Sequence, residues 1–431
     1  MDYQTSVTYI HSQPRLAKDG SLERIDALLA ALDHPEHGQR YVHVTGTNGK
    51  GSVANGIAHI LEASGLSVGL FTSPFIMRFN ERIMIDHQPL LDARLAQAAT
   101  ITRNALENLQ AQNADFVVTE FEFITAMALW AFRQAAVDVA VIEVGIGGKE
   151  DSTNVIMPKV AVITSVGMDH QALLGNTLTS IATHKAGIIK PQVPVVTGVL
   201  PEAAQAVVAA RVQATGSTWW QSGRDFSAGA GHVFDWGQRF DYQDADGKMP
   251  AVEVPLVGTF QPGNMAVAIR AAKAYATLSD WPLTPREIRK GLAKSVWPGR
   301  MEKISADPLI ILDGAHNPQG IQALITTMTQ LFGAQTVTVI AGVLKDKDVT
   351  TMVDALGRGR HRLWLVPVPD TPRATAVQDY PAGIRHFDQW QQALATHLQN
   401  HADEPLVITG SLYLVAAVRQ ALCGQEEDHD R

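Results

Sequence analysis

Short apolar runs alternate along the chain with longer segments whose apolar residues recur at helical spacing. Most of the short runs are rich in Val, Ile and Leu without alternating polar residues, which is typical of strands buried on both faces of a parallel sheet. We expect strands at 41–45, 68–72, 137–144, 160–164, 193–197, 309–313, 336–341, 362–366 and 406–409. This alternation predicts an α/β fold whose ligands bind at the carboxyl ends of the strands.

The alternation is interrupted twice. Residues 221–254 combine aromatics, glycines and alternating polar positions, which predicts a small antiparallel excursion. Near Trp297-Pro-Gly-Arg300 a Pro-Gly pair precedes a fresh strand–helix series. We therefore expect an N-terminal P-loop domain at 1–296, with a mostly parallel sheet flanked by helices, and a C-terminal Rossmann-like α/β domain at 297–431.

Composition narrows the class of protein. A chain of 431 residues exceeds the size of a single growing core, which agrees with two domains. Its 35 basic and 43 acidic side chains leave a formal charge of −8, which argues against nucleic acid or an anionic membrane as a partner. The single cysteine, Cys423, cannot form an internal disulfide, and the N-terminal residues lack the pattern of a signal peptide. We expect a cytoplasmic monomer with a disordered tail at 426–431.

The strongest chemical signal is the segment Thr45-Gly-Thr-Asn-Gly-Lys-Gly-Ser52, between an expected strand and an expected helix. Glycines allow successive backbone amides to point at phosphate oxygens, and the helix N-terminus adds a partial positive charge. Lys50 supplies a cation for the β- and γ-phosphates, and Ser52 can hold Mg²⁺. Gly51 separates these two residues, which departs from the common P-loop spacing. The segment predicts nucleotide binding by Asn48, Gly49, Lys50, Gly51 and Ser52.

This loop resembles that of the muramyl-peptide ligase and folylpolyglutamate synthase superfamily. Other segments match the same superfamily in order: 72–83, 143–148, 151–154, 168–170, 184–187, 261–264, 297–300, 313–318 and 410–413. The segment 72–83, Thr-Ser-Pro-Phe-Ile-Met-Arg-Phe-Asn-Glu-Arg-Ile, is similar to a mobile loop of the folate branch. The resemblance therefore covers nearly the whole chain, and it is to the folylpolyglutamate synthases.

The resemblance implies an ATP-dependent ligase that adds L-glutamate to the γ-carboxylate of a folate. An acyl phosphate forms first, and the amine of glutamate then attacks it. Cations at Lys50 and Arg300 would offset the repulsion between carboxylate and phosphate. The C-terminal domain would close over the N-terminal domain and exclude water, which otherwise hydrolyses the acyl phosphate.

The resemblance also implies a metal site. It assigns Ser73, Glu143 and His170 as Mg²⁺ ligands, with Ser52 near the nucleotide-bound ion. From the residues alone, His170 reads as a surface or capped residue and Lys185 as a solvated helix lysine. In similar ligases the lysine at position 185 is carbamylated by CO₂ and bridges toward a second Mg²⁺, which requires a neutral amine and hence a lowered pKa. A monovalent cation is a further expectation.

The remaining candidates concern the substrates. Asn264 is expected to begin a helix at 265–275 as its N-cap, and the resemblance adds a contact to adenine. Arg300 and Asp313 would reach the nucleotide across the cleft between the domains. Asn317 and Pro318 read as a helix N-cap and first-turn proline. His316 and Ser411 are expected to orient the glutamate, and His316 is, like Lys50, a catalytic candidate. Phe75, Phe79 and Arg82 lie in the loop shared with the folate branch, where exposed aromatics could stack on the folate rings or instead pack the loop down.

Three alternatives stay open at this stage. Within the same chemistry, the chain could be a bifunctional enzyme that also joins dihydropteroate to glutamate. The muramyl-peptide branch is disfavoured by the loop at 73–83. From a different class, the chain could be a P-loop regulatory ATPase that makes no ligase product. A product assay with labelled glutamate separates these readings.

Overall fold

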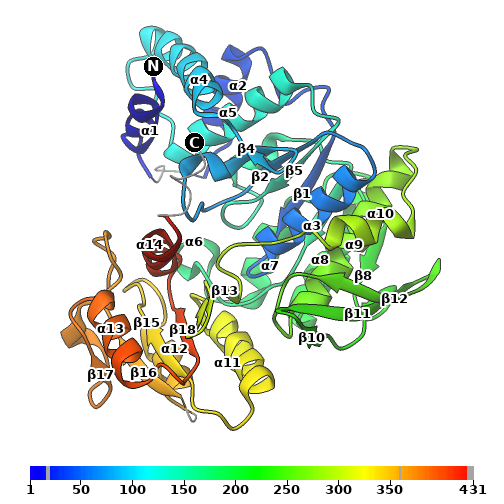
Figure 1. Ribbon diagram of the computed structural model, residues 1–431. Coiled ribbons are helices and arrows are strands. Elements are labelled where there is room, and N and C mark those ends of the chain that lie inside the picture. Colours follow the sequence, from blue (N-terminus) through cyan, green and yellow to red (C-terminus); the bar gives the residue numbers. More distant parts are fainter. Residues whose placement is uncertain (16–19, 359–360, 425–431) are drawn as a thin grey trace. The chain divides into compact units, whose positions relative to one another are not determined.

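Figure 1 shows the computed structural model of the chain, which describes residues 1–15, 20–358 and 361–424. The predicted tail at 426–431 lies outside these residues. The chain divides into two compact units: the first comprises residues 1–229, 241–252 and 263–295, and the second comprises 230–240, 253–262 and 296–431. Each unit has its own sheet and core, so each is described by itself.

The first unit is built on an eight-stranded sheet with the order β4-β3-β2-β5-β1-β6-β7-β8. Its strands are β1 (Tyr41–Thr45), β2 (Val68–Phe71), β3 (Ile83–Ile85), β4 (Gln88–Pro89), β5 (Val139–Glu143), β6 (Val160–Ile163), β7 (Val195–Thr197) and β8 (Trp219–Gln221). All neighbours are parallel except those involving β3 and β4, which form an antiparallel hairpin at one edge. Strand β1 is central: Val44 is in register with Glu143 on one side and Val162 on the other.

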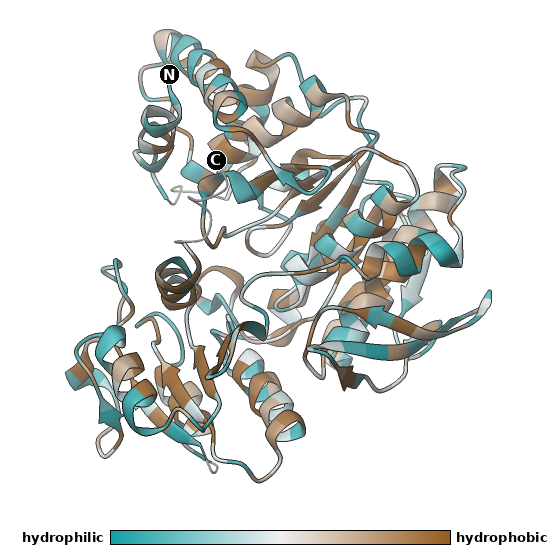
Figure 2. Cartoon of the chain, in the orientation of Figure 1, coloured by the Kyte–Doolittle hydropathy of each residue, from teal (hydrophilic) through white to brown (hydrophobic). Residues whose placement is uncertain are grey.

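Helices cover both faces of this sheet. They are α1 (Tyr3–His11), α2 (Glu23–Ala31), α3 (Lys50–Ala63), α4 (Asp92–Gln112), α5 (Glu120–Ala135), α6 (Gln171–Leu174), α7 (Leu178–Ala186), α8 (Glu202–Thr215), α9 (Gln261–Leu278) and α10 (Pro285–Leu292), with short 3₁₀ turns η1 (Phe79–Arg82) and η2 (Ser152–Val155). One buried cluster joins α1, α2, α4 and α5 to the sheet through residues such as Phe123 and Phe132, and another joins α7 and α8 through Ile181 and Val208. In Figure 2 the central strands of this sheet are coloured mostly as hydrophobic.

The predicted antiparallel excursion is confirmed. Strands β9 (Phe226–Ala228), β10 (His232–Phe234), β11 (Gly237–Asp244) and β12 (Gly247–Val254) form a separate four-stranded sheet. Strand β8, which shares only Gln221 with the predicted excursion, pairs in parallel with β7 in the large sheet.

The second unit contains a six-stranded sheet with the order β13-β14-β18-β15-β16-β17. Its strands are β13 (Glu302–Ala306), β14 (Leu309–Leu312), β15 (Thr338–Ala341), β16 (Arg362–Leu365), β17 (Arg385–His386) and β18 (Leu406–Thr409), and only β13 is antiparallel to its neighbour. Its helices are α11 (Pro318–Phe332), α12 (Val349–Gly357), α13 (Trp390–Asn400) and α14 (Leu412–Cys423), with a short turn η3 (Val377–Asp379). Separate buried clusters, one around Met328 and one around Trp364, complete an α/β layer structure. The predicted α/β fold class is confirmed.

One predicted helix boundary is wrong. Asn264 was expected to cap a helix at 265–275, but α9 begins at Gln261, so Asn264 is its fourth residue. The cause is the Pro262-Gly263 pair, which reads as a breaker in sequence. Proline is compatible with the first helical turn, because the amide it lacks would have no intrahelical partner there.

Candidate nucleotide and ligase site

The glycine-rich segment forms a tight loop between the central strand β1 and helix α3. The backbone N–H of Asn48 donates to Ser165 Oγ at 2.9 Å, and the Asn48 carbonyl accepts from Thr164 Oγ1 at 2.6 Å. Thr164 and Ser165 follow β6, the neighbour of β1 in the sheet. The loop is therefore fastened to the carboxyl end of the adjacent strand. The sequence prediction missed Thr164 and Ser165, although two hydroxyl residues at the end of an apolar run were visible.

Two glycines of this loop are required by contacts and by backbone conformation. A Cβ atom on Gly46 would lie 1.8 Å from Thr164 Oγ1. Gly49 has a φ of +83°, and a Cβ atom there would lie 2.6 Å from Asn264 Oδ1. The structure thus brings Asn264 of α9 directly against the loop, as a nucleotide-site role requires.

The lysine and the serine of the phosphate loop lie at the start of helix α3. Lys50, the first residue of α3, donates from Nζ to the carbonyl of Gly46 at 3.1 Å. Ser52 is the third residue of the helix, still in its first turn, and is almost fully buried. The α3 N-terminus therefore presents a lysine and backbone amides where an anion is favoured.

Glu143 and the glycines that follow it lie at the same edge of the sheet as the phosphate loop. Glu143 is the last residue of β5, on the other side of β1, and is 4% exposed. Its Oε2 accepts from the backbone N–H of Ser73 at 3.1 Å. The carbonyl of Gly147 accepts from Thr45 Oγ1 at 2.6 Å. The loop at 72–83, the acidic strand end and the phosphate loop are thereby joined.

His170 follows β6, so Glu143 and His170 stem from the two strands that flank β1. His170 has a φ of +50° and its side chain is 38% exposed. Its backbone N–H donates to Asp169 Oδ1 at 2.8 Å. The prediction from the residues alone, that His170 is a surface or capped residue, agrees with this exposure, and His170 Nε2 lies 4.0 Å from Asp169 Oδ2.

The expectation that Lys185 is solvated is wrong. Lys185 lies on α7 and is 3% exposed. Burial, together with the nearby charge of Lys50, lowers the pKa of its amine to about 7, against the opposing influence of Asp169 and Asp151. A substantial fraction of a neutral amine is therefore available near neutral pH, and a neutral amine is nucleophilic.

The loop at 72–83 is more packed than the sequence suggested. Of the two alternatives for the aromatics, packing holds for Phe79, which is 3% exposed, and the half-buried Phe75 packs against the same core. The Arg82 guanidinium lies over both rings, 5.1 Å from the Phe75 centroid and 5.5 Å from that of Phe79. The Glu81 carboxylate accepts from three backbone amides of the loop, which gives the loop a defined shape.

In the second unit, Arg300 and Asp313 lie close together. Asp313 follows β14 and is buried, and its carboxylate accepts from the backbone amides of Met301 at 3.0 Å and Ala315 at 2.9 Å. Burial raises the pKa of Asp313 above its ordinary value, although Arg300 acts in the opposite direction. A Cβ atom on Gly314 would lie 2.3 Å from Arg300 Nη1, so the guanidinium rests on that glycine.

His316 and Ser411 follow neighbouring parallel strands, β14 and β18, so both lie at the same edge of the second sheet. His316 Nδ1 is 2.8 Å from the carbonyl of Gly314, which directs the ring through that nitrogen. Asn317 caps α11 and Pro318 is its first residue, as predicted. Ser411 caps α14 by accepting from Tyr413 N–H at 3.2 Å.

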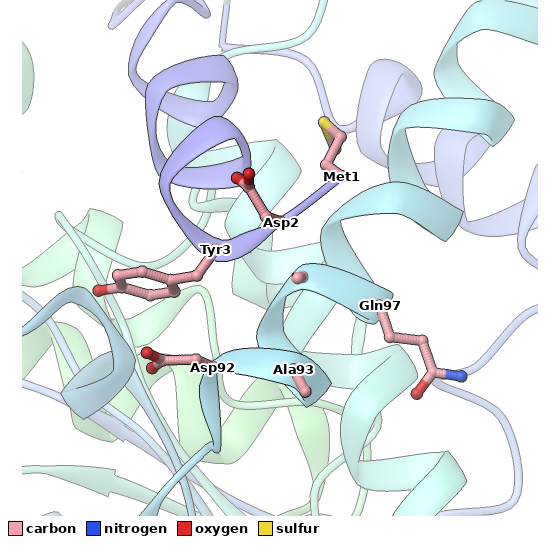
Figure 3. A pocket seen from close by; sticks show the side chains of 7 residues that line it. Met1, Asp2, Tyr3, Asp92, Ala93 and Gln97 are labelled. Carbon is pink, nitrogen blue, oxygen red and sulfur yellow. The ribbon is translucent and has the colours of Figure 1, made fainter.

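A cavity of about 460 Å³ lies elsewhere in the first unit. Figure 3 shows residues from the start of α1 facing the first turns of α4 across it, and its lining is Met1, Asp2, Tyr3, Asp92, Ala93, Ala96 and Gln97. None of the predicted site residues lines this cavity. Two residues of the loop at 72–83 reach its lining: Arg78 pairs with Asp92 at 2.8 Å, and Asn80 Nδ2 donates to Asp92 Oδ1 at 2.9 Å.

A glycine-rich loop between a central parallel strand and a helix, with a lysine and a buried hydroxyl in its first turn, defines a nucleotide-binding α/β protein of the P-loop class. Within that class, residues 44–272 match the Mur ligase middle domain and residues 299–412 match the Mur ligase glutamate ligase domain. The chain belongs to the Mur ligase family of ATP-dependent ligases, in the branch of the folylpolyglutamate synthases.

Several relatives place it in that branch. Folylpolyglutamate synthase of Lacticaseibacillus casei is 61% identical over 98% of this chain and 99% of its own length. Dihydrofolate synthase/folylpolyglutamate synthase of Bacillus subtilis (strain 168) is 35% identical over 97% of this chain and 99% of its own length. The solved structure of a folylpolyglutamate synthase (FPGS) in complex with AMPPCP and folate superposes on this chain with a TM-score of 0.92. It is 60% identical in sequence, and the match covers 98% of this chain and 100% of that chain. The predicted family is confirmed.

No helix within the described ranges is both long and apolar enough to cross a membrane.

Proposed function

We propose that this protein adds L-glutamate to the γ-carboxylate of a folate or folylpolyglutamate, with hydrolysis of ATP to ADP and phosphate. The observation that carries the proposal is the hydrogen bond from Ser73 to Glu143. It joins the loop that is similar to the folate branch to the strand end beside the phosphate loop. The identity of 61% to a folylpolyglutamate synthase supports the same reaction.

The reaction proceeds in two steps. The γ-carboxylate oxygen of the folate attacks the γ-phosphorus of ATP, the bond from that phosphorus to the β–γ bridging oxygen breaks, and an acyl phosphate and ADP result. The amine of glutamate then attacks the acyl carbon, inorganic phosphate leaves, and the amine releases a proton. The first step brings two anions together, so Lys50 has the role of offsetting their repulsion.

The residues at the sheet edge fit Mg²⁺. The Ser52 and Ser73 hydroxyls and the Glu143 carboxylate are hard oxygen donors, and Ser52 and Glu143 are already withdrawn from solvent. These residues would hold the ion, with His170 as a further ligand implied by the family. The metal would neutralise phosphate charge while the nucleotide is bound. A second Mg²⁺ and a monovalent cation are part of the same proposal.

Lys185 is proposed to react with CO₂. Its neutral Nζ attacks the carbon of CO₂, a carbamate forms, and a proton is released. The buried position and the pKa of about 7 support this reaction. Unmodified Lys185 in high-resolution density, together with full activity of Lys185→Ala, would contradict it.

The remaining residues are assigned by domain. We assign nucleotide and folate binding to residues 1–296 and glutamate binding to residues 297–431. Asn264, Arg300 and Asp313 are proposed to serve the nucleotide. His316 and Ser411 are proposed to orient glutamate, and Phe75 and Arg82 to contact the folate. The protein is proposed to act as a cytoplasmic monomer, without nucleic acid or membrane partners.

A product assay with radiolabelled glutamate tests the function. With ATP, Mg²⁺ and tetrahydrofolate, the label is expected to enter a folylglutamate with one ADP per amide bond. Parallel reactions contain dihydropteroate or a muramyl precursor in place of tetrahydrofolate. ATP consumption with no labelled product from any acceptor would overturn the ligase function in favour of a regulatory ATPase.

A second activity, the synthesis of dihydrofolate from dihydropteroate and glutamate, is supported by the names of two relatives. The relatives from Bacillus subtilis and Escherichia coli (strain K12) are both named dihydrofolate synthase/folylpolyglutamate synthase, at 35% and 31% identity. Labelled dihydrofolate from dihydropteroate in the same assay would establish a bifunctional enzyme. If that product is absent while tetrahydrofolate is used normally, the protein catalyses only the addition of glutamate to a folate.

A further inference from the structure

The central strand β1 carries a fully buried histidine in the middle of the large sheet. His43 is in register with Ile142 of β5 and with Ala161 of β6. A buried imidazole needs a hydrogen-bond partner for each proton that it carries. Its Nε2 lies 2.9 Å from Oγ1 of Thr153, a residue of η2 that is also fully buried. His43 therefore begins a hydrogen-bonded chain that leads out of the strand.

The direction of each hydrogen bond in this chain follows from the protons available. Thr153 Oγ1 donates to Asp151 Oδ1 at 2.5 Å, and a hydroxyl has only one proton to donate. Thr153 Oγ1 therefore accepts from His43, whose proton is on Nε2. His43 Nδ1 is buried and has no partner among the described residues, so a proton there would be an unsatisfied donor. The ring is accordingly neutral and held in one tautomer.

The chain ends on a carboxylate that shapes the glycine-rich segment after β5. Asp151 is buried, and its Oδ1 also accepts from the backbone N–H of Thr153 at 3.0 Å. Its Oδ2 accepts from the backbone N–H of Ile146 at 2.9 Å. A Cβ atom on Gly145 would lie 3.0 Å from the same Oδ2, so the carboxylate packs directly against this segment. The orientation of Asp151 therefore fixes the backbone at 145–148.

The segment 145–148 connects the phosphate loop to the helix that carries Lys185. Thr45 lies on the same face of β1 as the buried histidine, two residues further along, and its Oγ1 donates to the carbonyl of Gly147 at 2.6 Å. Gly148 packs against α7, because a Cβ atom there would lie 3.2 Å from the carbonyl oxygen of Lys185. The segment thus sets the spacing between the phosphate loop and Lys185.

We propose that His43 is a positioning residue for the ligase reaction proposed above, on which this inference rests. By donating to Thr153, it directs the threonine hydroxyl at Asp151, and the carboxylate in turn holds the segment 145–148. A displacement of reacting groups by about 1 Å can lower a rate by roughly 100-fold. A chain that fixes the spacing between two parts of the site therefore acts on kcat.

Two substitutions of Thr153 test the chain. Thr153→Val replaces the hydroxyl by a methyl group and removes the link between His43 and Asp151, whereas Thr153→Ser retains the hydroxyl. We expect Thr153→Val to lower the kcat of glutamate incorporation by about 10-fold or more, and Thr153→Ser to stay within about twofold of the wild type. The KM for ATP is expected to change by less than about twofold in both, because Thr164 and Ser165 hold the phosphate loop independently.

Thr125→Val is the matched control for a purely structural effect. Thr125 Oγ1 is buried and lies 2.9 Å from Ser152 Oγ in the same turn η2, but this hydrogen bond is outside the chain to Asp151. We expect Thr125→Val to lower the melting temperature, as Thr153→Val does, and to leave kcat per folded protein unchanged. Equal kcat in Thr153→Val and Thr153→Ser overturns the proposal, and so does an equal loss of kcat in the two valine variants.

The tautomer of His43 provides a test that depends on neither the variants of Thr153 nor ligase activity. Nitrogen-15 shifts of the histidine rings are recorded on the full chain between about pH 6 and pH 8, the range in which an unperturbed histidine titrates. The His43 signals are identified by their loss in His43→Gln. We expect a proton on Nε2 and none on Nδ1 throughout. A proton on Nδ1 overturns the proposal even in an active enzyme, whereas a wild type with the expected tautomer and no ligase product overturns the proposed function.

Discussion

At the scale of single residues, the buried amine of Lys185 makes stability depend on pH. Its pKa is about 7 in the folded chain and 10.5 in an unperturbed lysine. Between these values the unfolded chain binds a proton that the folded chain does not, so stability rises with pH across this window. Below pH 7 the full cost of burying the charged amine is present.

Replacing Lys185 by Met is expected to remove this cost. In CO₂-depleted buffer, we expect Lys185→Met to exceed the wild type in free energy of unfolding by roughly 2–4 kcal/mol below pH 7. The difference is expected to narrow as the pH is raised from 7 toward 10. Urea denaturation at a series of pH values measures this, and a difference that stays constant with pH would show that Lys185 does not titrate as described.

Substitutions at Gly49 and Gly65 distinguish the energetic cost of a strained backbone from the cost of a clash with a neighbouring side chain. Gly49 and Gly65 both have positive φ angles, +83° and +97°, but only Gly49 has a neighbour, Asn264, where a Cβ atom would lie. Gly65→Ala is expected to cost about 1 kcal/mol of stability, the backbone penalty alone. Gly49→Ala is expected to cost more and to raise the KM for ATP.

The double variant Gly49→Ala/Asn264→Ala serves as the control for the contact. Relief of the contact should return its stability toward that of Gly65→Ala. If Gly49→Ala and Gly65→Ala are equally stable and bind ATP equally well, the contact with Asn264 is unimportant.

At the scale of elements, capping fixes the helices that begin beside the second-unit site. Asn317 accepts from the backbone N–H of Gly320 at 2.8 Å and so caps α11. Asn317→Ala is expected to lower the free energy of unfolding by about 1 kcal/mol, and Asn317→Ser to retain most of it. Equilibrium denaturation measures both, and equal stability of the Ala and Ser variants would exclude a capping role.

The buried strands could be predicted from sequence because they carry a strong local signal. Strands β1 and β18 have the predicted bounds, and both are buried throughout. Strand β4 was not predicted, since it is only two exposed residues long and contains Pro89. Its existence depends on pairing with β3, which local sequence does not encode.

The same limit applies to the site. Lys50, Ser52 and Glu143 could be placed at strand ends because parallel strands bring their carboxyl ends to one edge. The hydroxyl of Ser165 and the amide of Asn264 could not be placed against the loop, because each contact joins residues more than a hundred positions apart. Burial of Lys185 likewise follows from packing of α7 and not from its own helical pattern.

At the scale of the whole molecule, turnover of ATP is expected to require both other substrates. With folate alone, at most one ADP per protein is expected before glutamate arrives, because the acyl phosphate is consumed only by an amine. Omission of folate should abolish turnover. Rapid ATP hydrolysis with neither folate nor glutamate, measured by phosphate release, would contradict this coupling.

The hydrogen bond between Asn48 and Ser165 also bears on how the protein is made. The two residues are 117 positions apart, and β1 has neither of its neighbours until β5 and β6 have been synthesised. At about 5–20 residues per second, a ribosome needs roughly 6–23 s to travel from one to the other. Although β5 is synthesised before the end of that interval, the phosphate loop of a nascent chain lacks its contacts with Thr164 and Ser165 throughout it, so we expect ATP not to stabilise the loop. Nucleotide can act as a folding ligand only after more than a third of the chain has left the exit tunnel.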